Sequence, residues 1–424
     1  MNQKMTLTFP LRIMLFLIII WPFLFTALAV AQEKQDSSLL LHAARVFDGE
    51  TVKTGVSVLV VGGKVAQILP REAINTDDRA TVLDLGDATI LPGLIELHAH
   101  LTYRKVPADI VLRHGITTIR DLGGPVHQPY GGDGNLRVLT SGPIITAPDG
   151  YPIAVLGAAD IAIAVTDEEQ AHATVRRLIS EGAAVIKVAL EPGGEVGAPW
   201  SAHHDHGHHG THDATHTGVH HPSAQHTTST LTSWPVLSQP IVSAIVQEAH
   251  RHGRKVSAHV AEATGAQIAL NAGVDEWAHL PCNHIPEPLL KQAIAQRVKI
   301  ISTMDTLSKC AGIAANAAAW TALGGELLYG AEIAHPDIPW GIDAQELLYL
   351  MQTANMHVLA VLRAATAKAG HHLGIPMLGS LQPGAPADII AVSGNPLLDL
   401  KRLEYPGLVI SGGRIIVNHF GIPD

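Results

Sequence analysis

The residues that could perform chemistry are concentrated first in one short stretch, residues 91–101. This stretch begins with a Pro-Gly turn, continues as an apolar run and ends in His98 and His100. Side chains two residues apart on a strand point to the same face, so the two imidazoles project together. Two imidazoles in this arrangement can hold one metal ion. A His-x-His pair also occurs by chance on many surface strands. Further residues of the chain are therefore needed to distinguish a metal-binding pair from a chance one.

Three further residues of suitable chemistry lie inside apolar, strand-like runs: Lys187, His259 and His279. A lysine is costly to bury as an ammonium ion. It either pairs with an interior carboxylate or is a neutral amine that can take up carbon dioxide and, as a carbamate, bridge two metals. A single buried histidine is more often a core residue than a ligand. Four histidines and a lysine at the ends of strands together predict a metal site.

Strand-like and helix-like runs alternate through the middle of the chain. The apolar strand-like runs are 91–101, 115–121, 142–146, 184–190, 255–260, 276–280, 299–304 and 327–332. Amphipathic helical runs, such as 168–180 and 241–252, lie between them. This alternation predicts an α/β protein with a TIM-like (β/α)₈ barrel, whose active site lies at the carboxyl ends of the strands. A doubly wound open sheet is the alternative, but no Gly-x-Gly-x-x-Gly loop supports it.

Both ends of the chain contain β-strand patterns. Residues 57–68 read as a hairpin around Gly-Gly, and 387–392 and 408–417 have the same character. The simplest arrangement is a small composite β-sandwich made from residues 32–90 and 376–424. The central barrel, residues 91–375, would then be inserted between the two parts.

The first 31 residues predict a signal peptide. Lys4 and Arg12 form a short positive region, an apolar run follows, and 29–31 is a small-x-small cleavage site. An uncleaved membrane anchor is the alternative, but Pro22 and the cleavage site favour removal. We therefore expect an exported protein, periplasmic or extracellular, without stable membrane anchoring.

Composition excludes some classes of function. A formal net charge of −10 without a basic cluster argues against nucleic-acid binding, so the expected partner is a small-molecule substrate. Two cysteines, Cys282 and Cys310, are too few for a disulfide scaffold, and their pairing is open from sequence alone. Association into a homo-oligomer is equally open.

Residues 201–230 interrupt the alternation with ten histidines among Gly, Thr, Asp and Ser. No apolar periodicity remains, so we expect a disordered insertion in the loop after the fourth strand, on the active-site side. It is either a tolerated low-complexity insertion or a tract that gathers metal near the site.

Taken together, these stretches resemble the amidohydrolase superfamily, in its imidazolonepropionase-like and prolidase-like (Xaa-Pro dipeptidase-like) branch. The resemblance rests on 91–101, on Gly-Ile-Thr-Thr-Ile-Arg-Asp-Leu-Gly-Gly at 115–124, on Ile-Lys-Val at 186–188 and on Ser-Ala-His-Val at 257–260. Gly-Val-Asp-Glu-Trp-Ala-His-Leu at 273–280 and Gly-Ser-Leu-Gln-Pro-Gly-Ala-Pro-Ala-Asp at 379–388 add to it. It covers essentially the whole chain after the leader. It implies a barrel with a flanking β-sandwich and one or two divalent metals, with zinc the default ion.

The resemblance also implies a role for each candidate residue. His98 and His100 would hold one metal, His259 and His279 the second, and a carboxylated Lys187 would bridge them. The family's last ligand and general base is an Asp in a Gly-Thr-Asp-like motif. This chain has Gly-Ala-Glu at that point, which favours Glu332. Asp337 and Asp343 are the other candidates, and Asp343 reads better as the start of a helix.

The resemblance leaves the substrate open. Dipeptidase-like relatives carry Gly-Gly-His after the third strand, whereas this chain has 147–152, Ala-Pro-Asp-Gly-Tyr-Pro, where Tyr151 either binds substrate or packs against the loop. The expected activity is hydrolysis of amide bonds in dipeptides or N-acyl amino acids. The alternatives are a cyclic amide or lactone hydrolase, and a catalytically weak zinc-binding protein that uses the histidine tract.

Overall fold

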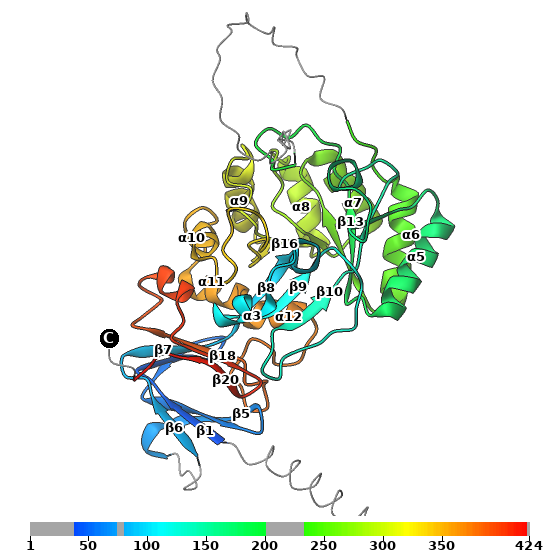
Figure 1. Cartoon of the computed structure of the whole chain (residues 1–424). Coiled ribbons are helices and arrows are strands. Elements are labelled where there is room, and N and C mark those ends of the chain that lie inside the picture. Colours follow the sequence, from blue (N-terminus) through cyan, green and yellow to red (C-terminus); the bar gives the residue numbers. More distant parts are fainter. Residues whose placement is uncertain (1–37, 74–79, 201–232, 422–424) are drawn as a thin grey trace, which may run out of the picture.

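Parallel strands build the central part of the chain. The computed structural model describes residues 38–73, 80–200 and 233–421 (Figure 1). In chain order the parallel strands are β8 (Leu94–Ala99), β9 (Ile116–Asp121), β10 (Arg137–Thr140), β11 (Ile144–Thr146), β12 (Ala162–Ala164), β13 (Val185–Ala189), β14 (Lys255–His259), β15 (Glu276–Trp277), β16 (Lys299–Ile301) and β17 (Glu326–Leu328). Each of the eight strand-like runs of the sequence overlaps one of these strands. The sequence pattern missed β10 and β12.

The parallel strands form two sheets. One has the order β10-β9-β8, and the other has the order β12-β11-β13-β14-β15-β16-β17. Backbone hydrogen bonds join the two sheets at both sides. The His100 N–H donates to the Ile333 carbonyl at 2.9 Å, and the Ala184 N–H donates to the Thr140 carbonyl at 2.8 Å. An α/β fold with parallel sheets is thus present, while a closed eight-stranded barrel stays a prediction.

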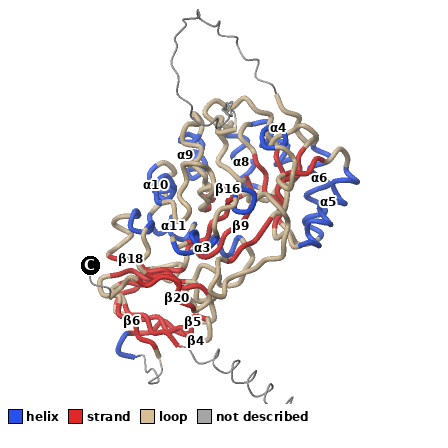
Figure 2. Tube along the Cα trace, viewed as in Figure 1, coloured by secondary structure: helices blue, strands red, loops and turns tan. Residues whose placement is uncertain are grey.

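Helices connect these strands and cover them from outside (Figures 1 and 2). They are α2 (Leu101–Arg104), α3 (Ala108–Arg113), α4 (Ile153–Leu156), α5 (Glu168–Glu181), α6 (Gln239–Arg251), α7 (Ala263–Ala272), α8 (Glu287–Ala295), α9 (Ile313–Ala322), α10 (Ala344–Gln352), α11 (Val358–Ala364) and α12 (Ala367–His372). Helix α5 shows why they form where they do. The Asp167 side chain caps its first turn by accepting the Gln170 N–H at 2.8 Å. Its buried residues, Ala171, Val175 and Leu178, recur at helical spacing.

Strands from both ends of the chain lie together beside this α/β part. A four-stranded sheet has the order β5-β4-β1-β6, and a six-stranded sheet has the order β20-β19-β18-β7-β2-β3. Their strands are β1 (Ser38–His42), β2 (Arg45–Phe47), β3 (Val52–Thr54), β4 (Val56–Val61), β5 (Lys64–Pro70), β6 (Thr81–Asp84), β7 (Ala88–Pro92), β18 (Ile389–Ser393), β19 (Leu408–Ser411) and β20 (Arg414–Asn418). The larger sheet mixes early and late strands, and one buried apolar cluster joins both sheets, among its members Leu41, Val58, Ile90, Ile389 and Ile410. The boundaries of a separate domain stay a prediction.

Two further sequence features have a structural outcome. Cys282 and Cys310, whose pairing was open, form a disulfide between the loops after β15 and β16. The leader (1–31) lies outside the described residues, as does all of the histidine tract. No helix in the described ranges is long and apolar enough to cross a membrane.

Candidate metal centre

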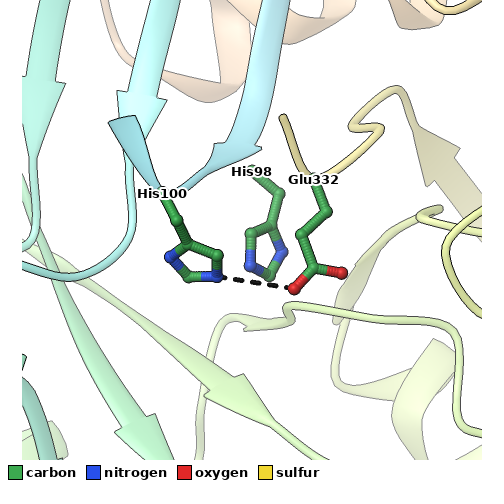
Figure 3. Close-up of side chains that lie close together, drawn as sticks. All are labelled: His98, His100 and Glu332. Atoms are coloured by element: carbon green, nitrogen blue, oxygen red, sulfur yellow. Dashed lines mark ion pairs between the residues drawn. The ribbon is translucent and has the colours of Figure 1, made fainter. Parts of the chain in front are cut away.

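Strand β8 delivers His98 and His100 to its carboxyl end. His98 is fully buried within the strand, and His100 directly precedes α2. A third residue, Glu332, arrives from the loop after β17, and its Oε1 lies 3.4 Å from His100 Nε2. One ligand atom from each of the three residues lies within 4.8 Å of the other two (Figure 3). Such spacing suits the first shell of one metal ion.

The loop after β17 selects Glu332 from the three acidic candidates. Asp337 is exposed. Asp343 caps α10, because its Oδ1 accepts the Gln345 N–H at 2.9 Å. Glu332 adopts a left-handed backbone conformation, with φ at +67°. A non-glycine residue there costs on the order of 1–3 kcal/mol, and such strain clusters at functional sites.

The remaining predicted ligands come from neighbouring strands. Lys187 lies in β13, His259 ends β14, and His279 follows β15; each is no more than 3 % exposed. The His279 ring centroid lies 4.4 Å from that of His98 and 4.6 Å from that of His259. One cavity is lined by all six residues that the sequence suggested as ligands, together with Tyr151. The structure thus brings the whole predicted set together, while their roles stay a prediction.

The imidazole rings are oriented by hydrogen bonds on their far sides. His98 Nδ1 lies 2.7 Å from the Ala278 carbonyl, which assigns the ring proton to Nδ1 and leaves the Nε2 lone pair free. His279 Nδ1 lies 3.0 Å from Thr303 Oγ1. Fixing the ring through its other nitrogen is the usual support of a metal-binding histidine.

Buried polar atoms without a partner converge on the same cavity. Among the described residues, no hydrogen-bond partner reaches His98 Nε2, Lys187 Nζ, His259 Nε2 or Glu332 Oε2. Buried polar groups are nearly always paired, so four such atoms on residues that line one cavity need a common explanation. Nitrogen and carboxylate donors of this kind fit one or two divalent metal ions.

Burial sets the protonation of these groups. It lowers the pKa of His98 and His279 well below the usual value and that of His259 to about 3, so the rings are neutral. Burial also lowers the pKa of Lys187 to about 7. For Glu332, burial favours the neutral acid, but the hydrogen bond and charge of His100 outweigh it and lower its pKa. Neutral imidazoles and an ionised carboxylate are the forms that bind metal.

Two buried carboxylates that sequence reasoning missed hold β8 and its neighbours in place. Glu96 Oε1 accepts the His98 N–H at 2.7 Å, and its Oε2 accepts the Ala331 N–H at 2.9 Å. Asp121 accepts the N–H groups of Leu101 and Thr102, each at 3.0 Å. Glu96 therefore ties His98 to the segment that carries Glu332, and Asp121 fixes the turn after His100. Both acids lie in stretches that the sequence marks as important, 91–101 and 115–124. Their backbone partners are visible only in the fold.

An aromatic wall, which we define as Tyr151, Trp200 and Trp234, lies beside the cavity, and Tyr151 is the member that lines it. Tyr151 is half-buried and stacks on Trp234 with ring centroids 5.5 Å apart. It also lies 4.7 Å from the His259 ring, and Trp200 lies 4.5 Å from the same ring. Tyr151 therefore faces the site. Whether it binds substrate or only packs against the loop stays a prediction. The two tryptophans were missed, because each stands alone at one end of the stretch 201–232.

A carboxylate beside His259 was missed as well. Glu191 follows β13 and is 1 % exposed, and its Oε2 lies 3.4 Å from His259 Nε2. Burial raises the pKa of Glu191 to about 7. Its only sequence signal is a carboxylate four residues after Lys187, at the start of Glu-Pro-Gly-Gly-Glu.

Comparison with known proteins adds a family. Residues 290–416 match the amidohydrolase family. Ochratoxinase from Aspergillus niger is 30 % identical over 190 residues, an alignment that spans 40 % of this chain and 40 % of that protein. The chain therefore matches less than half the length of this curated relative.

Solved structures share the fold over most of the chain. The crystal structure of A. niger ochratoxinase superposes with a TM-score of 0.69 at 20 % identity, covering 90 % of this chain and 96 % of that one. A Xaa-Pro dipeptidase with bound methionine gives 0.68 at 21 % identity, covering 89 % and 99 %. Molinate hydrolase gives 0.68 at 15 % identity, covering 92 % and 96 %. At these identities the likeness concerns the fold.

Proposed function

We propose that this chain is a metal-dependent hydrolase of carbon–nitrogen bonds in small amides, such as dipeptides or N-acyl amino acids, in line with the match of residues 290–416 to the amidohydrolase family. One observation carries the proposal. Six residues from five strand ends line one cavity, and four of them, His98, Lys187, His259 and Glu332, each present one of the buried polar atoms with no partner in the described parts of the chain. We further propose that the strands form a TIM-like barrel, flanked by a composite β-sandwich. The hydrogen bonds that join the two parallel sheets at both sides support it.

We propose that His98, His100 and Glu332 hold one divalent ion and that His259 and His279 hold a second, with Lys187 between them. Zinc is the default for this donor set. When bound, such ions lower the pKa of water from roughly 16 to about 7 and polarise a substrate carbonyl.

Glu332 is the proposed general base. Its carboxylate is ionised, because His100 lowers its pKa, and it is held beside His100 at 3.4 Å. A general base must lie within hydrogen-bond reach of the proton it removes, and Glu332 lies at the cavity where the ligands meet. It takes a proton from the attacking water and returns it to the leaving nitrogen.

Lys187 is proposed to act as a carbamate. Because burial lowers its pKa to about 7, a large fraction of the amine is neutral at neutral pH. The neutral Nζ attacks carbon dioxide, forms an N–C bond and releases one proton. The product is a carbamate with one negative charge shared by its two oxygens, so it can serve two ligand positions.

Tyr151 is the proposed substrate-binding residue. It faces the cavity and lies within the aromatic wall, where an apolar part of a small substrate can pack. The relatives named above are an ochratoxinase, a Xaa-Pro dipeptidase and a molinate hydrolase, so their names alone do not select one substrate for this chain. A panel of dipeptides, N-acyl amino acids, cyclic amides and lactones separates amide cleavage from the cyclic alternative.

Export to the periplasm or the extracellular space is also a proposal. It rests on the leader pattern at 1–31 and is supported by the bond between Cys282 and Cys310, because structural disulfides persist in oxidising compartments.

The first test is metal content by elemental analysis of mature protein that lacks residues 203–226, since ten histidines would obscure the count. We expect about two ions per chain in the parent, and hydrolysis of at least one linear amide of the panel that His98→Asn abolishes. Absence of metal after purification in zinc would contradict the proposal. It would instead favour a zinc-binding role for the histidine tract, which the structure does not describe.

A further inference from the structure

Glu191 occupies an unusual position for a buried carboxylate. It is 1 % exposed, directly follows β13 and stands four residues beyond Lys187. Its Oε1 accepts the Gly193 N–H at 2.7 Å. Its Oε2 points to no hydrogen-bond partner among the described residues. One oxygen is therefore fixed by the loop, and the other is left facing the cavity side of the strand.

The nearest group to that free oxygen is a nitrogen that also lacks a partner. Glu191 Oε2 and His259 Nε2 lie 3.4 Å apart, too far for a good hydrogen bond. Glu332 Oε1 and His100 Nε2 are separated by the same 3.4 Å. Ligand atoms held at about 2.1 Å by one tetrahedral zinc ion lie about 3.4 Å apart. The separation therefore suits two ligands of one ion.

We propose that Glu191 is a ligand of the metal ion held by His259 and His279, a seventh protein ligand beyond the six that the sequence suggested. The inference rests on the proposed metal-dependent function. Glu191 gives this ion a carboxylate that does not depend on carboxylation of Lys187. Each half of the centre then has one carboxylate beside one histidine, Glu332 with His100 and Glu191 with His259.

The surroundings of Glu191 match those of a metal-binding carboxylate. Such carboxylates are themselves hydrogen-bonded, so that the ligand oxygen is held in place. Here the Gly193 N–H fixes Oε1, and Glu195, also 1 % exposed, lies beside Glu191. Trp200 Nε1 donates to Glu195 Oε2 at 3.2 Å, which holds Glu195 in turn. An isolated ion pair between Glu191 and His259 would not need this support.

The test is metal affinity of the full chain rather than activity. Zinc is titrated against a chromophoric chelator, and cobalt is titrated by its visible absorption, for the parent, Glu191→Gln and Glu191→Asp. Every protein contains the same residues 201–232, so metal bound there cancels in the differences. Glu195→Gln tests the support of this ligand, because Glu195 lies beside Glu191, and it should weaken the same metal equivalent less than Glu191→Gln does. Glu169→Gln, in an exposed position of α5, controls for surface charge.

We expect Glu191→Gln to weaken one metal equivalent at least about tenfold and to change the cobalt spectrum, with Glu191→Asp between it and the parent. The Glu169→Gln control should stay within threefold of the parent. His259→Asn is the reference for loss of that equivalent. If His259→Asn loses one metal equivalent while both Glu191 variants bind metal as tightly as the parent, the proposed role of Glu191 alone is wrong. Parent-like affinity in His259→Asn and His98→Asn as well would overturn the proposed function with it.

Discussion

The ion pair of Arg120 and Glu276 gives the sharpest prediction on stability. Arg120 lies in β9 and is 2 % exposed, and Glu276 lies in β15 and is fully buried. Two hydrogen bonds of 3.0 and 2.6 Å join the guanidinium to the carboxylate. Arg120 Nε also donates to the Leu97 carbonyl at 2.8 Å. The pair therefore connects the strand that carries His98 with the strand that leads to His279.

Glu276→Gln removes the negative charge and leaves Arg120 charged in the interior. Breaking a buried pair on one side costs about 3–5 kcal/mol, whereas replacing both partners with apolar residues is often neutral. His372 also contacts Glu276, so the variant loses a second partner. We expect a loss of about 3 kcal/mol in the free energy of unfolding. Arg120→Met combined with Glu276→Met should recover most of that loss.

The pH dependence gives an independent check. Burial alone would raise the pKa of Glu276, but Arg120 and His372 outweigh it and hold the pKa well below its usual value. The folded state therefore releases this proton at a lower pH than the unfolded state. The stabilisation is complete above the ordinary glutamate pKa of 4.5 and is lost as the pH falls below it. Glu276→Gln should lack this acid-dependent part.

Urea unfolding of metal-free protein at pH 7 and at pH 4 measures both effects. Glu181→Gln is the control, because its pair with Arg177 is exposed, and it should change the unfolding free energy by less than about 0.5 kcal/mol. A loss below about 1 kcal/mol in Glu276→Gln would refute the argument that Arg120 depends on this carboxylate. So would a double variant as unstable as the single one.

Three further predictions follow from the site and its surroundings. Glu332→Gln should lower kcat about 10²–10⁴-fold on the preferred linear amide. Glu332→Asp keeps the negative charge and should lower kcat less. Equal losses of kcat in the two variants, measured by steady-state assays, would argue against Glu332 as the general base. In metal-free protein, burial lowers the Lys187 pKa from 10.5 to about 7, so the unfolded state binds more protons between these values and stability rises with pH. Lys187→Met should remove about 1.4 kcal/mol per pH unit from that slope in urea unfolding at pH 7.5 to 9.5, and an unchanged slope would mean that the amine is not buried as described. Cys282→Ser with Cys310→Ser should lower the unfolding free energy by about 3–4 kcal/mol, because the bond closes a loop with a sequence separation of 28, and parent-like unfolding under oxidising conditions would contradict this.

The strand pattern was predictable because it depends on local properties of the sequence. Each of the eight apolar runs overlaps an observed strand, for example 184–190 around β13 and 255–260 around β14. Short apolar runs between turns predict buried strands. Residues at the carboxyl ends of parallel strands lie at the same edge of the sheet. The positions of His98, Lys187 and His259 followed from this rule. Strand β12, only three residues long, has too little pattern to be recognised.

The residues that sequence reasoning missed depend on contacts between distant segments. The contact of Glu191 with His259 could not be predicted from the sequence, because it depends on the pairing of Ala189 with His259 in neighbouring strands. Glu96 looks like an ordinary strand residue until the segment after β17 places the Ala331 N–H against it. The sequence already favoured Glu332 over Asp337 and Asp343, and the structure adds the contact of its carboxylate with His100. Spacing along the chain cannot supply these pairings.

The conformation of Glu332 explains how a longer acid can stand where the resemblance suggested aspartate. An extra methylene moves the carboxylate outward unless the backbone compensates. Here φ of Glu332 is +67°, and the preceding residue is tied to β8 by the bond from the Ala331 N–H to Glu96. The carboxylate then meets His100 at 3.4 Å. The backbone around Glu332 therefore compensates for the longer side chain.

The aromatic wall bears on the histidine tract. Trp200 directly precedes 201–232, and Trp234 follows that stretch after Ser233. The Trp234 backbone N–H donates to the Pro192 carbonyl at 2.7 Å, and Trp200 lies 4.5 Å from the His259 ring. The described residues that flank the tract on both sides are therefore held beside the site. A deletion of 203–226 spares both anchors, so a change in metal content or activity after it would report on the histidines, whereas a deletion that included either tryptophan would damage the cavity as well.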